Sequence, residues 1–117
     1  MAERDPEELL PLTPAVFHVL LALVDAERHG YGIIKEVEAR TDGKVRLGAG
    51  TLYGSVKRML SEGLVAESDE RPDPEADDER RRYYRLTDFG RRVVSAEARR
   101  LEQLVSVARE KRLLSRA

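Results

Sequence analysis

The segment that decides the fold reads Gly48-Ala-Gly-Thr-Leu-Tyr-Gly-Ser-Val-Lys-Arg-Met-Leu60. At about 100° per residue, its large apolar side chains share one side of a helix: Leu52, Val56, Met59 and Leu60. The opposite side carries Gly50, Gly54, Lys57, Arg58 and Ser61. Since glycine costs a helix about 1 kcal/mol relative to alanine, two glycines on an outward face indicate that something large approaches the backbone closely. The pattern favours a helix that lies in a DNA groove; the alternative is a surface helix with a solvated basic face.

Length and composition limit the other possibilities. With 117 residues the chain is expected to form one domain with a modest core. No apolar run approaches the roughly 20 residues of a membrane span, and the acidic N-terminus is unlike a secretory signal, so we expect a cytoplasmic protein. Cysteine is absent, which excludes disulfides and thiolate metal sites.

The net charge of −1 conceals a strongly uneven distribution. Residues 43–61 hold four cations and no carboxylate, and residues 80–92 hold six arginines against Asp88 alone. Residues 67–79, between them, hold eight carboxylates and only Arg71. Because the local field steers a polyanion, two basic patches remain compatible with DNA binding.

Turn and cap residues divide the chain into elements. A polar lead-in over residues 1–11 precedes Thr13-Pro14, which is typical of a helix start. The helix that follows, to about Val24, is apolar on nearly every side and is expected to be buried all round. A turn over residues 25–30 leads to a second helix over 31–40, and Gly63 has the position of a left-handed cap ending the third.

The second half of the chain predicts a wing and a long helix. Residues 64–68 and 81–86 have the alternating character of two short strands, joined by a polar loop too long for a tight turn. Thr87 then caps a helix reaching to about Arg112, some 37 Å long at 1.5 Å per residue. Its apolar stripe is broader than one packing seam requires, so we expect a symmetric dimer, although intramolecular core is the alternative.

This order of elements is that of a winged helix-turn-helix with a C-terminal dimerisation helix, a mainly α (α+β) fold, and its residues resemble the PadR-like family of bacterial transcriptional regulators. Five segments carry the resemblance in order: Leu12-Thr-Pro-Ala, His29-Gly-Tyr-Gly-Ile33, Gly50-Thr-Leu-Tyr53 with Val56-Lys-Arg-Met59, Glu62-Gly-Leu-Val65 and Arg82-Tyr-Tyr-Arg-Leu-Thr-Asp-Phe-Gly90. The division expected is 1–11 lead-in, 12–86 DNA-binding domain and 87–117 dimerisation helix.

The resemblance implies a homodimer that binds a pseudo-palindromic operator in double-stranded DNA, mostly as a repressor, and a possible small aromatic or drug-like effector. The residues assigned to DNA contact are Tyr31, Lys35, Lys44, Arg46, Gly50, Thr51, Tyr53, Gly54, Lys57, Arg58, Arg80, Arg81 and Arg82. Those assigned to dimerisation are Val16, Phe17, Leu20, Val94, Ala98, Leu101, Leu104, Val105 and Ala108. An effector pocket is expected around Phe17, His18 and Leu101.

Two features depart from the family pattern. Gly48-Ala49 stands where a Ser or Thr cap followed by proline is frequent, so the start of the third helix is expected to be soft. The acidic loop over 69–79 would be repelled by phosphates, and we expect it to turn away from DNA. The three arginines over 80–82 are expected at phosphates, although they could simply neutralise that loop.

Other classes of function are less well supported. No Ser-His-Asp set, metal cluster or phosphate loop stands out, so we expect no enzyme, no cofactor and no metal site. Of the two histidines, His18 is expected in the core or an interface and His29 in a turn. The rival function is a winged-helix protein-interaction module, whose helix face binds an acidic protein partner.

Overall fold

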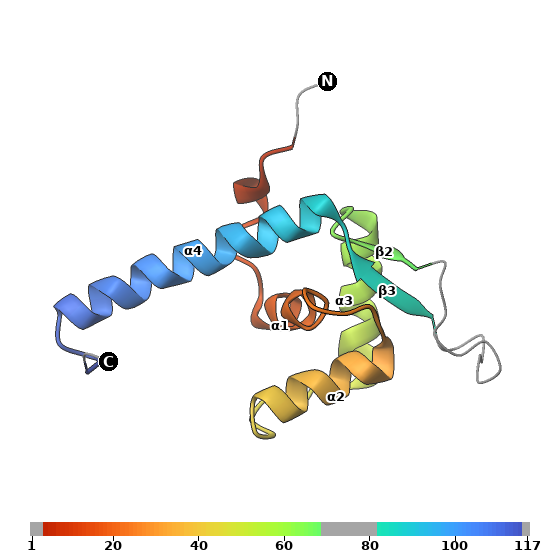
Figure 1. The fold of residues 1–117 in the computed structure, drawn as a ribbon, viewed down its shortest axis with the longest axis horizontal. Helices are drawn as coiled ribbons and strands as arrows, with labels where there is room; N and C mark the ends of the chain where they lie inside the picture. The colour runs from red at the N-terminus through yellow and green to blue at the C-terminus, as the bar shows by residue number, and fades with distance from the viewer. Residues whose placement is uncertain (1–3, 69–81, 116–117) are drawn as a thin grey trace.

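The computed structural model describes residues 4–68 and 82–115. A small sheet lies at one side of the helices, and one long helix projects toward the other side (Figure 1). In chain order the elements are the 3-10 helix η1 (Pro6–Leu9), α1 (Pro14–Ala22), β1 (Arg28–His29), α2 (Gly30–Arg40), α3 (Ala49–Ser61), β2 (Val65–Glu67), β3 (Tyr83–Leu86) and α4 (Asp88–Glu110). None of the helices in the described part is long and apolar enough to cross a bilayer.

The helix boundaries follow from the caps. The Thr13 hydroxyl accepts the Val16 N–H at 3.2 Å, with proline at the first position of α1, as predicted. Gly63 has φ +77°, and the N–H of Leu64 donates to the carbonyl of Met59 at 2.9 Å, which confirms the left-handed cap after α3. The Thr87 hydroxyl accepts the Gly90 N–H at 2.9 Å and caps α4.

The core lies where α1 packs on α2, α3 and α4. Its fully enclosed side chains include Val19, Leu20, Ile33, Leu52 and Val93, each 0 % exposed. The expectation that α1 is buried all round is wrong in part, because Phe17, His18 and Leu21 are only half-buried. The three neighbouring helices cover only part of the circumference of α1, and so small a domain has no further layer to cover the rest.

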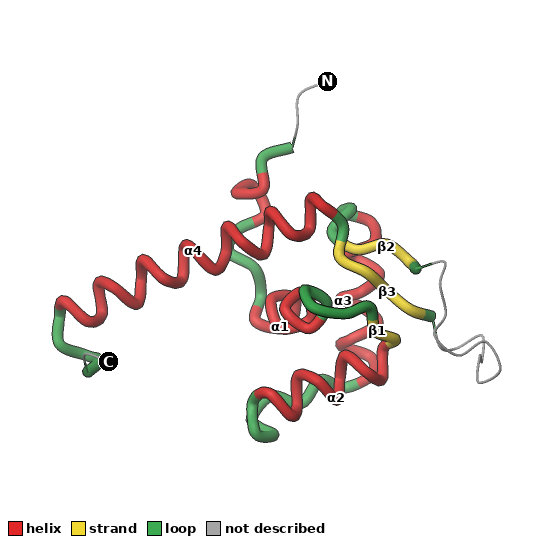
Figure 2. Tube along the Cα trace, viewed as in Figure 1, coloured by secondary structure: helices red, strands yellow, loops and turns green. Residues whose placement is uncertain are grey.

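The sheet has three strands in the order β1-β3-β2, all antiparallel (Figure 2). The predicted strands are confirmed in kind, with Val65 opposite Leu86 and Glu67 opposite Tyr84. Strand β1 is an addition, since residues 28 and 29 lie in a segment predicted to be a turn. Arg28 pairs with Tyr84 and His29 with Tyr83, so the start of α2 is attached directly to the wing.

Helix α4 is buried only at its beginning. Val93, Val94, Ala96 and Glu97 are buried, whereas no side chain over residues 98–115 is. At 1.5 Å per residue its 23 residues extend about 35 Å, and the C-terminal half runs clear of the other elements in Figure 1.

Candidate nucleic-acid interface

Helix α3 is held by one face and exposed on the other, as its sequence predicts. Leu52, Val56 and Met59 are at most 2 % exposed and pack into the core. No side chain caps its first turn, since Gly48 occupies the cap position. The uncapped start agrees with the departure from the family pattern at residues 48 and 49.

The exposed face of α3 carries glycine and cations but no carboxylate. Gly50, Thr51, Gly54, Lys57 and Arg58 are all exposed. A Cβ added to either glycine would meet nothing within 4 Å, so the protein's own packing does not require glycine there. The absence of side chains leaves the backbone of α3 open to close approach from outside.

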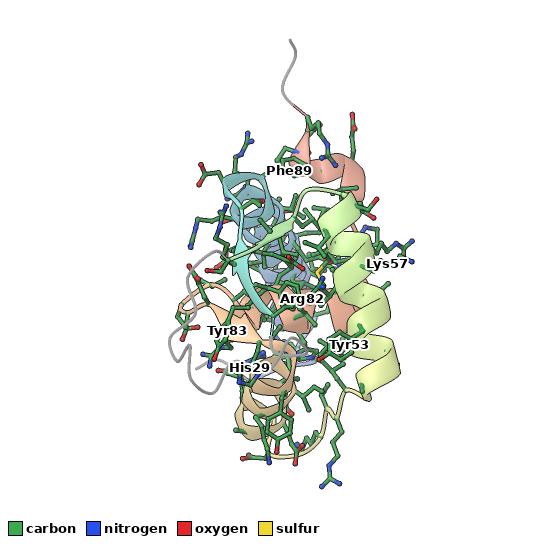
Figure 3. All side chains as sticks on the ribbon, turned by 90° about the vertical axis from the view of Figure 1, so that its right-hand side faces the viewer. His29, Tyr53, Lys57, Arg82, Tyr83 and Phe89 are labelled. Carbon is green, nitrogen blue, oxygen red and sulfur yellow. The ribbon has the colours of Figure 1, made fainter. Side chains whose placement is uncertain are left out.

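Tyr53 lies at the edge of this face, toward the beginning of α2 (Figure 3). Its side chain is 45 % exposed, and its phenolic oxygen would be 2.5 Å from a Cβ on Gly30. Glycine at position 30 therefore allows the Tyr53 ring to lie against the backbone of α2.

The first turn of α2 carries a second exposed aromatic side chain, that of Tyr31. His29 caps the helix, with Nδ1 accepting the Gly32 N–H at 3.0 Å, and its ring meets Tyr83 edge-on at 5.2 Å between centroids. Tyr31 is 61 % exposed, and the Lys35 ammonium lies 5.3 Å from the centre of its ring. A hydrogen bond with Tyr31 raises the pKa of Lys35, so the lysine stays charged beside the tyrosine at neutral pH.

Other predicted cations lie around this surface. Lys44 and Arg46 are exposed in the connection between α2 and α3. On the wing, the Arg82 guanidinium donates to Glu67 at 3.0 Å, so its charge is partly offset within the sheet. Arg80 and Arg81 lie outside the described residues.

Arg58 has a partner that the sequence analysis missed. Its Nε lies 3.5 Å from a carboxylate oxygen of Glu62, one turn further along. The spacing of four residues is a readable signal for such a pair. Lys57, by contrast, has no ion-pair partner among the described residues.

The residues predicted for dimerisation fall into two groups. Val16, Leu20 and Val94 are 8 %, 0 % and 5 % exposed, so they belong to the protomer's own core and their assignment to the dimer surface is corrected. An apolar helix face in the sequence does not by itself tell a protomer core from an interface. The others are partly or fully exposed: Phe17 on α1, and Ala98, Leu101, Leu104, Val105 and Ala108 on α4.

The three predicted effector residues are all half-buried: Phe17, His18 and Leu101. The Nδ1 of His18 lies 3.2 Å from the Arg40 guanidinium, which also donates to the His18 carbonyl. Burial, assisted by the Arg40 charge, lowers the pKa of His18. A ligand site at these three residues stays a prediction.

The match to a known family agrees with this geometry. The model of the transcriptional regulator PadR-like family matches residues 19–96, which is more than half of the chain. The chain belongs to this family. The match runs from α1 through the wing into α4, and it places the PadR-like protein among transcriptional regulators rather than enzymes.

Two relatives match the PadR-like chain over 74 % of its length. The transcriptional regulator Rv3488 of Mycobacterium tuberculosis is 33 % identical over 87 residues, which are 75 % of its own length. An uncharacterised 37.1 kDa protein of transposon TN4556 from Streptomyces fradiae is 36 % identical over 86 residues. The matched region spans only 22 % of that protein.

Solved structures share the fold. A PadR family transcription regulator from Clostridium difficile has a TM-score of 0.69 at 23 % identity, covering 84 % of this chain and 97 % of that one. BpsR of Bordetella bronchiseptica, whose DNA binding is regulated by 6-hydroxynicotinic acid, has a TM-score of 0.64 at 26 % identity, covering 87 % and 66 %. The winged helix-turn-helix prediction is thereby confirmed.

Proposed function

We propose that this PadR-family regulator binds a pseudo-palindromic operator as a homodimer, represses transcription, and is released by a small-molecule effector. The observation that carries the proposal is the exposed face of α3, on which two glycines and two cations face outward; Arg58 pairs with Glu62, whereas Lys57 has no ion-pair partner among the described residues. Lysine and arginine bond guanine edges or phosphates, and open glycines let the backbone approach a groove.

Three elements supply the proposed contacts. Tyr53 and Lys57 on α3 would read the major groove, with Thr51 at the helix start. Tyr31 and Lys35 on α2 and Arg82 on the wing would meet phosphates, since the β1–β3 pairing places these elements side by side. Phosphate contacts fix the orientation of the protein, and base contacts supply the sequence preference.

The proposed dimer rests on the projecting half of α4. Leu104, Val105 and Val107 are 55 %, 37 % and 45 % exposed there, beside half-buried Leu101 and Ala108. A helix of this length with an uncovered apolar stripe is stabilised by a partner, and a second copy supplies the same stripe by symmetry. Two α3 helices held about 34 Å apart would then reach successive major grooves.

Effector release is supported by the regulation of BpsR by 6-hydroxynicotinic acid, a property of that relative. In this chain the corresponding molecule would bind the protein and weaken the operator complex. Repression and its relief are therefore tested together, by transcription from the operator with and without the bound molecule.

Salt dependence tests DNA binding itself. Operator duplexes selected from a random pool should bind with log affinity falling steeply against log salt, and Lys35→Ala should reduce that slope by about 1, because Lys35 is assigned to a phosphate. Lys111→Ala, at the far end of α4, is the control and should leave the slope unchanged. Binding with a shallow slope and no preferred sequence would instead support the protein-interaction module.

A further inference from the structure

A cavity of about 220 Å³ lies between the N-terminal segment and the last turn of α3. Its apolar wall is formed by Leu9, Leu12, Val16, Met59 and Leu64. Met59 and Leu64 are each 1 % exposed, so this wall is part of the core. The cavity is separate from the region of Phe17, His18 and Leu101.

Polar contacts fix the position of the N-terminal segment, which forms one side of the cavity. Arg4, ahead of η1, donates to the Glu62 carbonyl at 2.6 Å and lies 4.2 Å above the ring of Phe89. Further along, the Leu12 N–H donates to the buried carboxylate of Glu97 at 2.8 Å. These contacts hold the N-terminal segment against both α3 and α4, so the cavity is preformed.

The charged groups of the lining favour a cation. Glu8 and Glu62 contribute two carboxylates, and Arg58 contributes one guanidinium. Arg58 is already within 3.5 Å of Glu62, whereas Glu8 has no ion-pair partner among the described residues. An apolar wall with one unpaired carboxylate at its edge suits a molecule with an apolar body and one positive group.

We propose that this cavity binds a small hydrophobic amine, with its apolar body against Leu12 and Met59 and its ammonium group beside Glu8. Because Arg58, Met59 and Glu62 belong to the end of α3, the occupant touches the helix that carries the DNA-facing residues. Binding stands on the cavity alone; only its regulatory consequence rests on the proposed function.

Methionine labelling makes the site directly observable. The chain has two methionines, Met1 and Met59, so a protein carrying ¹³C-methyl methionine has one reporter in the cavity wall. Titration with 2-phenylethylamine should shift the Met59 methyl signal saturably and give a nuclear Overhauser effect between the phenyl protons and that methyl. The carboxylate analogue 3-phenylpropionate should bind at least about tenfold more weakly, since it meets unpaired like charge.

A matched pair of variants tests the proposed charge contact. Because Glu8 is exposed, Glu8→Gln should weaken amine binding about twofold to fivefold, the range of a solvent-accessible ion pair. Glu7→Gln is the control, because Glu7 is the neighbouring residue of η1 but borders α4 rather than this cavity. The proposal is overturned by an absent Overhauser effect, by equal losses in the two variants, or by equal binding of the carboxylate analogue.

The amine titrations contain no operator DNA, so their outcome does not depend on whether the protein binds an operator. Amine binding without any operator binding would refute the proposed function and leave the site standing. Operator binding without amine binding would refute the amine site and leave the proposed function standing. Where both occur, the amine must change operator affinity by the same factor by which the operator changes amine affinity.

Discussion

The phenol of Tyr53 on α3 lies directly against the backbone of Gly30 on α2, where a Cβ would be 2.5 Å from the Tyr53 oxygen and 2.9 Å from Cζ. Glycine at the first position of α2 thus accommodates the tyrosine of another helix in its present position. Because the ring is 45 % exposed, it has room to move if Gly30 gains a side chain.

Gly30→Ala should therefore fold but displace Tyr53, weakening operator binding. The matched control is Gly32→Ala, in the same helical turn, whose Cβ would be no closer than 3.5 Å to the His29 ring. That variant should keep operator affinity and gain up to about 1 kcal/mol of stability from helix propensity. Duplex titration and urea unfolding of both variants measure the contrast, and equal operator affinity in the two would show that the Tyr53 position is irrelevant to DNA.

Gly54→Ala tests whether DNA approaches the exposed face of α3 closely. Since nothing lies within 4 Å of the added methyl group, the free protein should become about 1 kcal/mol more stable. Operator affinity should fall all the same, because the methyl group occupies the space that a groove wall would enter. A variant both more stable and equally tight on DNA would rule out close approach at this glycine.

The double variant Leu101→Asp and Leu104→Asp should dissociate the dimer, since buried carboxylates would then meet without partners. Each protomer should stay folded, because Leu104 is 55 % exposed and neither residue belongs to the buried core. Sedimentation measures the mass, and operator affinity should be lost with the dimer. Ser106→Asp, on the opposite side of the helix, is the control and should remain dimeric. An undiminished dimer in the double variant would refute the assignment.

Glu97 predicts an acid-sensitive contribution to stability. Its carboxylate is 2 % exposed and accepts hydrogen bonds from Arg100 and from the Leu12 N–H; the Arg100 bond is the main cause that lowers the pKa of Glu97. A depressed carboxyl pKa stabilises the fold above the ordinary value of roughly 4.3, and this stability is lost as pH falls from there through the depressed value.

Glu97→Gln should lower the free energy of unfolding by about 1–3 kcal/mol at neutral pH. Below a pH of about 4.3, the stability of the variant should fall less steeply than that of the parent protein. Urea midpoints from neutral to acidic pH, taken as the difference between the two proteins, cancel the titration of other carboxylates. Parallel profiles would mean that Glu97 does not contribute to acid sensitivity.

The sequence predicts well whatever depends on neighbours within about one helical turn. The caps at Thr13 and Thr87, the glycine after α3 and the inward and outward faces of α3 are of this kind. A hydroxyl at a cap or an apolar residue at every third or fourth position acts through local hydrogen bonds and helical geometry, so the pattern is visible in the chain itself.

What only the tertiary structure decided depends on residues far apart in the chain. Arg28 pairs with Tyr84 in a strand that reads as a turn, and Tyr53 rests on Gly30. Val16, Leu20 and Val94, which the sequence leads one to expect at an interface, fill the protomer core. Local periodicity states which face is apolar, whereas the packing of separate elements determines what covers that face.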